Sequence, residues 1–278
     1  MTFGNKNNKD PEGHKRVAFI VNTFPEQSQT FIFSQIIALL EAGYEVDIFS
    51  LFHPVSVANH EQLETYQLLE RTQYLLPEIA DSRKNRLRTL LSLPGMLLRA
   101  MFSQAGPRLS DALHLLRGRN ITGLRNLQYL SRLAPIKRDY GALIAHFGQM
   151  GVYAAQMKRS GVLRGPLAVV YHGVDMSQRN FLNQWRPLYP SVFRQAHLLL
   201  PVSQHWAQQL QHWGAPANKI KVQHMGVDVP ATLNLKAIPA GAALRVLTVA
   251  RATEKKGLRY IVEAIARCEV PIDARIIG

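Results

Sequence analysis

Short apolar runs alternate with helical segments along most of this 278-residue chain. Continuous apolar runs bounded by loops are typical of parallel strands that are covered on both faces. Strands that alternate with helices predict an α/β fold built on a doubly wound parallel sheet. The strands expected in the first part of the chain are residues 16–22, 44–51, 142–145, 167–171, 197–202 and 219–223. The helices expected between them begin at residue 27 or 28, at 151 and at 203.

The alternation stops and restarts once, which divides the chain into two domains. Residues 230–243 are rich in small residues and hold two prolines and one glycine, as a linker does. We expect a disordered tail at 1–14, a Rossmann-like domain at 15–229 and the start of a second Rossmann-like domain at 244–278. One strand–helix–strand unit is too small for a sheet-based domain. We therefore expect the second domain to be incomplete and the sequence to be truncated.

Positive charge is concentrated in one region of the chain. The sequence has 33 Lys and Arg against 19 Asp and Glu, a formal net charge of +14. Twelve of the basic residues and one acid, Asp111, lie within residues 83–138. Leucines mixed with arginines predict a basic helical insert at about 60–140 that binds an anionic membrane surface. A solvated basic face is the alternative, and the scarcity of aromatic residues there argues against nucleic-acid binding.

Cysteine usage and hydropathy exclude several classes of protein. The single cysteine, Cys268, excludes an internal disulfide and a cysteine-based zinc site. No apolar run reaches the ~18 residues of a membrane-spanning helix. The polar first 15 residues do not form a secretory signal peptide. We expect a cytoplasmic protein that attaches peripherally to the inner face of the cytoplasmic membrane.

The loop after the first strand is the first candidate for a ligand site. It reads Thr-Phe-Pro-Glu-Gln-Ser-Gln-Thr at 23–30 and leads into a helix. Ligands of open α/β sheets bind in this crevice, where helix N-terminal amides can hold an anion. Ser28, Gln29 and Thr30 are therefore candidates for a phosphate or acceptor loop. The lack of a G-x-G-x-x-G motif weakens a dinucleotide reading, and capping of the helix by Ser28 and Thr30 is the alternative.

Three later segments place polar residues directly after expected strands. His172, followed by Gly173, lies at a strand end, from which it can donate a hydrogen bond to a substrate hydroxyl or phosphate. His146 has the same setting, and Asp175 follows His172 closely. A structural role in a turn or in packing is the alternative for both histidines. Gly226 and Asp228 are weaker candidates, of which Gly226 permits an unusual backbone turn. The alternative is that this segment is only the turn by which the chain leaves the first domain.

The segment 247–257 carries the most specific motif of the chain. It reads Leu-Thr-Val-Ala-Arg-Ala-Thr-Glu-Lys-Lys-Gly, which predicts a strand, a basic loop and a helix that begins near Gly257. Arg251, Lys256 and the positive end of that helix surround one crevice, as expected of a diphosphate site. A solvated surface loop is the alternative.

Together these segments resemble the family 4 glycosyltransferases, and in particular the members that build bacterial exopolysaccharides such as colanic acid. The opening residues 16–51 are similar to a strand, an F-P-x-x-S-E-T-F-I loop and a helix ending in G-x-E-V, with Gln29 in place of the usual acid. The segments AHFG, YHGVD, LLLPVSQHWAQQLQHWGAPANKIKVQHMGVD and LTVARATEKKGLRYIVEAIA follow in the family's order. The resemblance covers roughly residues 15–52 and 142–278.

The resemblance implies a two-domain GT-B fold and a retaining transfer of a sugar. The N-terminal domain would bind a lipid-linked saccharide acceptor, and the C-terminal domain a nucleotide-diphospho-sugar donor. His172 matches the histidine beside the transferred sugar, and Arg251 and Lys256 match the pair that holds the donor diphosphate. No metal or other cofactor is implied, because Arg, Lys and helix amides can stabilise the charge of the leaving diphosphate. The lack of a DxD-like motif agrees with this.

The sequence departs from the family pattern at its end. Family members carry an E-x7-E element, beyond the Arg/Lys loop, that contacts the sugar and the ribose, and this sequence reaches Gly278 without it. We therefore expect the 278-residue chain to be inactive as a transferase. A non-catalytic remnant that binds only acceptor or membrane is the rival interpretation. A sugar-nucleotide epimerase with the same fold is a third, which the Arg251 loop and the turn at Gly226 disfavour.

Overall fold

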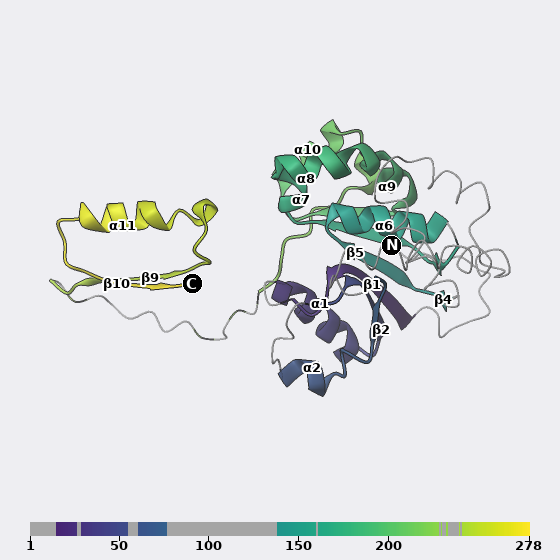
Figure 1. The fold of residues 1–278 in the computed structure, drawn as a ribbon, viewed down its shortest axis with the longest axis horizontal. Coiled ribbons are helices and arrows are strands. Elements are labelled where there is room, and N and C mark those ends of the chain that lie inside the picture. The colour runs from purple at the N-terminus through teal and green to yellow at the C-terminus, as the bar shows by residue number, and fades with distance from the viewer. Residues whose placement is uncertain are drawn as a thin grey trace, which may run out of the picture. The chain divides into compact units, whose positions relative to one another are not determined.

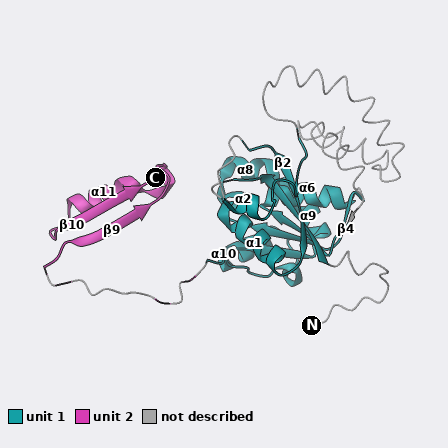
Figure 2. Ribbon diagram, turned by 90° about the horizontal axis from the view of Figure 1, so that it is seen from below, with its two compact units in different colours: residues 1–227 teal, residues 228–278 magenta. Residues whose placement is uncertain are grey.

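The computed structural model describes residues 15–26, 29–54, 61–76, 138–159, 161–227, 229, 232, 239 and 241–278. Figure 2 shows that the chain divides into two compact units, residues 1–227 (unit 1) and residues 228–278 (unit 2). The expected tail at 1–14, nearly all of the basic span 83–138 and most of the expected linker lie outside the described residues.

Unit 1 is built on a six-stranded parallel sheet in the order β3-β2-β1-β5-β7-β8. Every pairing in this sheet is parallel. This confirms the predicted α/β class. The strands are β1 (Arg16–Thr23), β2 (Glu45–Phe52), β3 (Thr72–Tyr74), β5 (Ala142–His146), β7 (Leu167–Tyr171) and β8 (Leu198–Pro201).

Helices cover both faces of this sheet (Figure 1). Successive residues of β1 point to opposite faces, as the pleat of a strand requires. Phe19 packs in one buried cluster with Ile32 and Ile36 of α1, whereas Ala18 and Ile20 belong to the cluster that includes α6. The helices are α1 (Thr30–Glu41), α2 (Glu61–Thr65), α6 (Gly148–Arg159), α7 (Val174–Ser177), α8 (Arg179–Trp185), α9 (Tyr189–Gln195) and α10 (Gln204–His212).

Short elements complete unit 1. The two-residue strands β4 (Arg138–Asp139) and β6 (Leu163–Arg164) form a separate parallel pair, the 3-10 turn η3 (Arg186–Leu188) joins α8 to α9, and the 3-10 turn η4 (Ala217–Lys219) follows α10. None of the helices in the described parts of the chain is long and apolar enough to cross a bilayer.

Two expectations about the strands were wrong. Residues 219–223 form no strand: two of their amides bond to Leu199 and Pro201 of β8, but only one isolated bridge, to Ile220, is made. The sixth strand is instead β3, which lies within the segment expected to be a helical insert and pairs with β2. Its three residues are too few for a strand pattern to be recognised in the sequence.

Unit 2 consists of one strand–helix–strand unit. Its parallel strands are β9 (Leu244–Val249) and β10 (Ile272–Ile277), with the turn η5 (Glu254–Lys256) and helix α11 (Leu258–Ala266) between them. The elements predicted for residues 244–277 are confirmed. No residue of α11 is buried, and large apolar side chains such as Val249 (69% exposed) and Tyr260 (65%) lie open to solvent.

Candidate functional site

The order of the strands places a topological switch point at the carboxyl edge of the sheet in unit 1. The chain leaves β1 toward β2 on one side and returns through β5 on the other side. Ligands of doubly wound sheets bind at such a switch point, outside the carboxyl ends of the strands. The loop after β1, the residues that end β5 and those that follow β7 all lie at this edge, because the strands are parallel.

Two predicted histidines meet at this edge. His146 ends β5 and His172 follows β7 directly. The Nδ1 atom of His146 lies 3.0 Å from Nε2 of His172, so the two rings share one hydrogen bond. His146 is fully buried, whereas His172 is partly exposed. The ring of His172 is therefore the part of the pair that a ligand can reach.

Aromatic rings surround the histidine pair. Phe19 of β1 stacks on His146, with 5.8 Å between the ring centroids and 10° between the ring planes. The ring of Phe31, in the first turn of α1, has its centroid 4.6 Å from that of His172. The centroid of the Phe147 ring lies 4.5 Å from that of His172. These contacts hold the two imidazoles in place and keep them in an apolar environment.

Burial keeps both imidazoles uncharged at neutral pH. Desolvation, with a contribution from the nearby His172, lowers the pKa of His146 to about 3. Desolvation also lowers the pKa of His172 to about 4. At pH 7 each ring thus carries one proton, and His172 acts as a neutral hydrogen-bond partner and not as a cation.

We expect acid to destabilise unit 1 through these rings. Histidines of the unfolded chain take up protons near pH 6.5, whereas the folded pKa values are lower. The stabilisation is therefore complete above that pH and is lost, by about 1.4 kcal/mol per pH unit for each ring, as the pH falls toward the folded values. The measurement is urea unfolding followed by fluorescence of the chain's three tryptophans, all of which lie in unit 1.

The control for this prediction is His146→Phe, which keeps a ring but removes one titrating group. Between pH 7 and pH 5 the wild type should lose about 2 kcal/mol more of its free energy of unfolding than this variant. Burial raises the pKa of Asp175, which acts in the opposite direction, but Asp175 is present in both proteins. Equal losses in the two proteins would show that His146 is not held neutral.

Asp175 ties the two histidine segments together. Its side chain is fully buried and accepts hydrogen bonds from the backbone N–H groups of Gly148 (2.8 Å), His172 (3.0 Å) and Gly173 (2.8 Å). The backbone oxygen of Asp175 accepts a further bond from the hydroxyl of Tyr189 (2.9 Å). One carboxylate thus joins the N-terminus of α6 to the turn after β7.

The backbone around the histidines is strained in ways that explain its glycines. Phe147 adopts φ +74°, a conformation that few residues other than glycine adopt. Gly173 has φ +114°, and Gly148 lies so close to the rings of Tyr189 and Tyr171 that a Cβ would collide with them. The glycine after each histidine therefore has a steric cause.

The predicted loop after β1 is described only in part. Ser28 lies outside the described residues. Gln29 occupies the N-cap position of α1 without a side-chain capping bond, and Thr30 is the first residue of the helix. Its neighbour Phe31 contacts both histidines, which brings the start of α1 to the site. The sequence did not predict this contact; the position of Phe31 directly after the candidate Thr30 was the available signal.

In unit 2 the predicted cationic loop follows β9. Arg251 and Lys256 are exposed, and Lys256 ends the turn η5. Gly257 adopts φ +66° and is the N-cap residue of α11, so the helix begins where the sequence predicted. An exposed arginine and lysine beside a helix N-terminus are able to bind a phosphate group.

The weaker candidates near residue 226 receive less support from the geometry. Gly226 was expected to permit an unusual turn, but its φ lies outside the left-handed region and a Cβ there would meet nothing within 4 Å. That argument was wrong, since any residue fits this exposed position. Asp228 lies outside the described residues.

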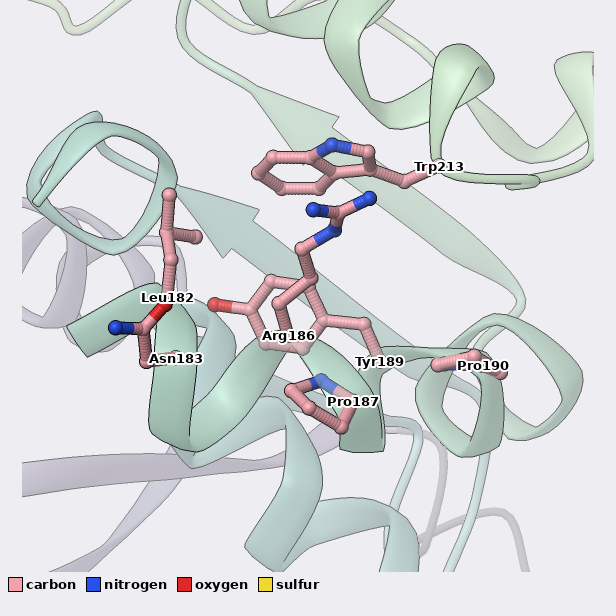
Figure 3. A pocket seen from close by; sticks show the side chains of 7 residues that line it. All are labelled: Leu182, Asn183, Arg186, Pro187, Tyr189, Pro190 and Trp213. Carbon is pink, nitrogen blue, oxygen red and sulfur yellow. The ribbon is translucent and has the colours of Figure 1, made fainter. Parts of the chain in front are cut away.

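A shallow pocket of about 570 Å³ lies among α8, η3, α9 and the end of α10, and Tyr189, which bonds to Asp175, is part of its lining. Figure 3 shows the guanidinium of Arg186 lying against the indole of Trp213, with Tyr189 below. The Cζ atom of Arg186 is 5.2 Å from the centroid of the Trp213 ring. None of the predicted site residues lines this pocket.

Solved structures with the same fold are GT-B glycosyltransferases. The apo form of the lipopolysaccharide outer core galactosyltransferase WaaB matches with a TM-score of 0.56 and 12% identity, over 95% of this chain and 60% of that protein. Anabaena HepE in complex with UDP-glucose matches with a TM-score of 0.55 and 14% identity, over 94% and 60%. At this level of identity the likeness establishes the fold, as predicted from the sequence.

The sequence comparisons establish the family. Residues 28–230 match the model of Glycosyltransferase Family 4, and the chain belongs to this family. It is 35% identical over 269 residues to the colanic acid biosynthesis glycosyltransferase WcaL of Salmonella typhimurium, and 35% identical over 254 residues to the amylovoran biosynthesis glycosyltransferase AmsK of Erwinia amylovora. These matches cover 95% and 90% of this chain but 64% and 60% of the two relatives.

Proposed function

We propose that this chain serves glycosyl transfer from a nucleotide-diphospho-sugar to a saccharide acceptor in exopolysaccharide synthesis. The observation that carries the proposal is the neutral, partly exposed His172 at the switch point of a family 4 chain. The colanic acid and amylovoran relatives support the pathway class, and the UDP-glucose complex of HepE supports a nucleotide sugar as donor.

Each candidate residue has a role that suits this chemistry. His172 would donate a hydrogen bond to an oxygen of the sugar or of its diphosphate. Arg251, Lys256 and the N-terminus of α11 would stabilise the negative charge that develops on the leaving diphosphate. Such groups carry out this task without a metal ion, so we infer a metal-independent transfer that retains the anomeric configuration.

The acceptor and the membrane form a second part of the proposal. A polysaccharide assembled in the cytoplasm needs a carrier, and we infer a lipid-linked saccharide. The basic residues within 83–138 would hold the protein at the anionic inner leaflet. Co-sedimentation should rise with the anionic content of vesicles and fall with salt. Co-sedimentation that changes with neither the anionic lipid content nor the salt concentration would contradict attachment by charge.

The proposal is tested with a completed chain, by which we mean the 278 residues joined to the part of Salmonella WcaL that follows the counterpart of Gly278. The assay supplies nucleotide sugars and lipid-linked saccharides and records both the released nucleoside diphosphate and the glycosylated lipid. The proposal expects release that depends on the acceptor, with the anomeric configuration retained in the product. Release that is equally fast without acceptor would contradict transfer.

Removal of Arg251 should weaken donor binding in the completed chain. Hydrogen bonds to charged groups contribute about 1.5–3 kcal/mol, so Arg251→Ala should raise KM for the nucleotide sugar roughly 10- to 100-fold. Lys255→Ala is the matched control, because Lys255 is an exposed cation of the same turn that is not assigned to the diphosphate. Equal effects of the two substitutions would indicate a general charge effect and not a specific site.

A further inference from the structure

The two ring nitrogens of His146 have different surroundings. Its Nδ1 atom faces Nε2 of His172 at 3.0 Å. Its Nε2 atom is buried and has no hydrogen-bond partner among the described residues. One nitrogen of this buried ring is therefore engaged with the candidate catalytic histidine, and the other is left unpaired in an apolar environment beside Phe19.

Only two arrangements of the protons are consistent with two neutral rings. In the first, Nδ1–H of His146 donates to Nε2 of His172, and the unpaired Nε2 of His146 carries a lone pair. In the second, Nε2–H of His172 donates to Nδ1 of His146, and the unpaired Nε2 of His146 carries a proton. Buried N–H groups of the backbone are left without a partner more rarely than acceptors are. The same preference applied to imidazole favours the first arrangement.

The first arrangement determines what His172 offers to a ligand. With its Nε2 occupied as an acceptor, a neutral His172 carries its proton on Nδ1. The rings of Phe31 and Phe147 pack on His172 and oppose rotation of the imidazole. His172 thus presents an N–H donor, which suits an oxygen acceptor such as a sugar hydroxyl or a phosphate oxygen.

We propose that His146 is a positioning residue that donates from Nδ1 to Nε2 of His172 and so fixes His172 as the Nδ1–H tautomer, ready to donate to a substrate oxygen. The assignment of a substrate oxygen rests on the proposed function, whereas the tautomers of the two rings do not. His146 itself contacts no ligand in this account, because it is fully buried behind His172.

Long-range 1H–15N correlation spectra of the 278-residue chain with 15N-labelled histidine test the proposal directly. The ten histidines include His146 and His172, whose signals are assigned from His146→Asn and His172→Gln. We expect Nδ1–H on both rings at pH 7 and an N–N coupling across the hydrogen bond between them. Finding His172 with its proton on Nε2 would overturn the proposal.

Two substitutions at position 146 separate positioning from packing. His146→Phe keeps an aromatic ring but has no donor, whereas His146→Asn places an amide N–H near the position of Nδ1. We expect His172 to lose its Nδ1–H preference in His146→Phe and to keep it in His146→Asn. In the completed chain kcat should fall roughly 10- to 100-fold in His146→Phe, with most of it restored in His146→Asn. An unchanged tautomer in a folded His146→Phe would contradict the proposal.

The spectra and the assay test separate claims, so either claim can fail while the other stands. If both tautomers are as proposed but the completed chain transfers no sugar, then the proposed function is wrong and the positioning of His172 stands. If sugar is transferred but His172 carries its proton on Nε2, then the function stands and the role of His146 is wrong.

Discussion

His172→Ala should lower kcat of the completed chain by about 10²–10³, the loss that follows removal of one preorganised hydrogen-bond donor to developing charge. The effect is large because His172 is partly buried against Phe31 and Phe147, and a hydrogen bond in such a desolvated setting is worth more than in water. Initial rates of acceptor-dependent nucleoside diphosphate release measure it. KM should change less than kcat if the bond forms mainly in the transition state.

The control for this substitution is His212→Ala. His212 is exposed in the last turn of α10 and belongs to no candidate site, so its loss should leave the rate unchanged. A His172→Ala protein that is folded by tryptophan fluorescence and transfers sugar at nearly the wild-type rate would remove His172 from the mechanism.

Asp175→Ala should destabilise unit 1 by about 3–5 kcal/mol, because it leaves three backbone N–H groups, two of them buried, without an acceptor. Urea unfolding followed by tryptophan fluorescence at pH 7 measures the loss. A second consequence is that the segments carrying His146 and His172 are no longer joined, so transfer should also fall.

Two further substitutions show whether the acceptor atoms of Asp175 are responsible. Asp175→Asn keeps the shape and one acceptor oxygen, so its loss should be clearly smaller than that of Asp175→Ala. Asp139→Ala removes an exposed carboxylate whose contact with Arg164 is 3.8 Å, and it should have no measurable effect. If Asp175→Ala unfolded at the same urea concentration as the wild type, the three N–H groups would have found other hydrogen-bond partners.

The sequence was a good guide to the sheet wherever strands are long and apolar. Five of the six strands of the main sheet were expected at nearly their observed positions, because β1, β5, β7 and β8 are mainly apolar runs and β2 begins with alternating polar and apolar residues. The strand β3 was missed because three half-buried residues show no periodicity. Residues 219–223 were wrongly predicted to be a strand, since their alternation reflects a segment that follows the edge of β8 without forming a ladder.

The candidate site was predictable residue by residue but not as an assembly. His146 and His172 each stand out because a glycine and a strand end lie nearby, yet 26 residues separate them and nothing in their spacing indicates a shared hydrogen bond. The parallel order of β1, β5 and β7 brings them together, and that order appears only in the folded sheet. The same holds for Phe31, which follows the candidate Thr30 in the sequence and which the fold brings into contact with both imidazoles.

The central proposal is that His172 and its neighbours at the carboxyl edge of this sheet act in sugar transfer to an acceptor, together with a complete donor domain. Acceptor-dependent nucleotide-sugar turnover, measured side by side for the 278-residue chain and the completed chain, tests it most directly. We predict turnover by the completed chain and none by the 278 residues alone. Robust turnover by the 278 residues, or none by a folded completed chain across the nucleotide sugars tested, would contradict the account.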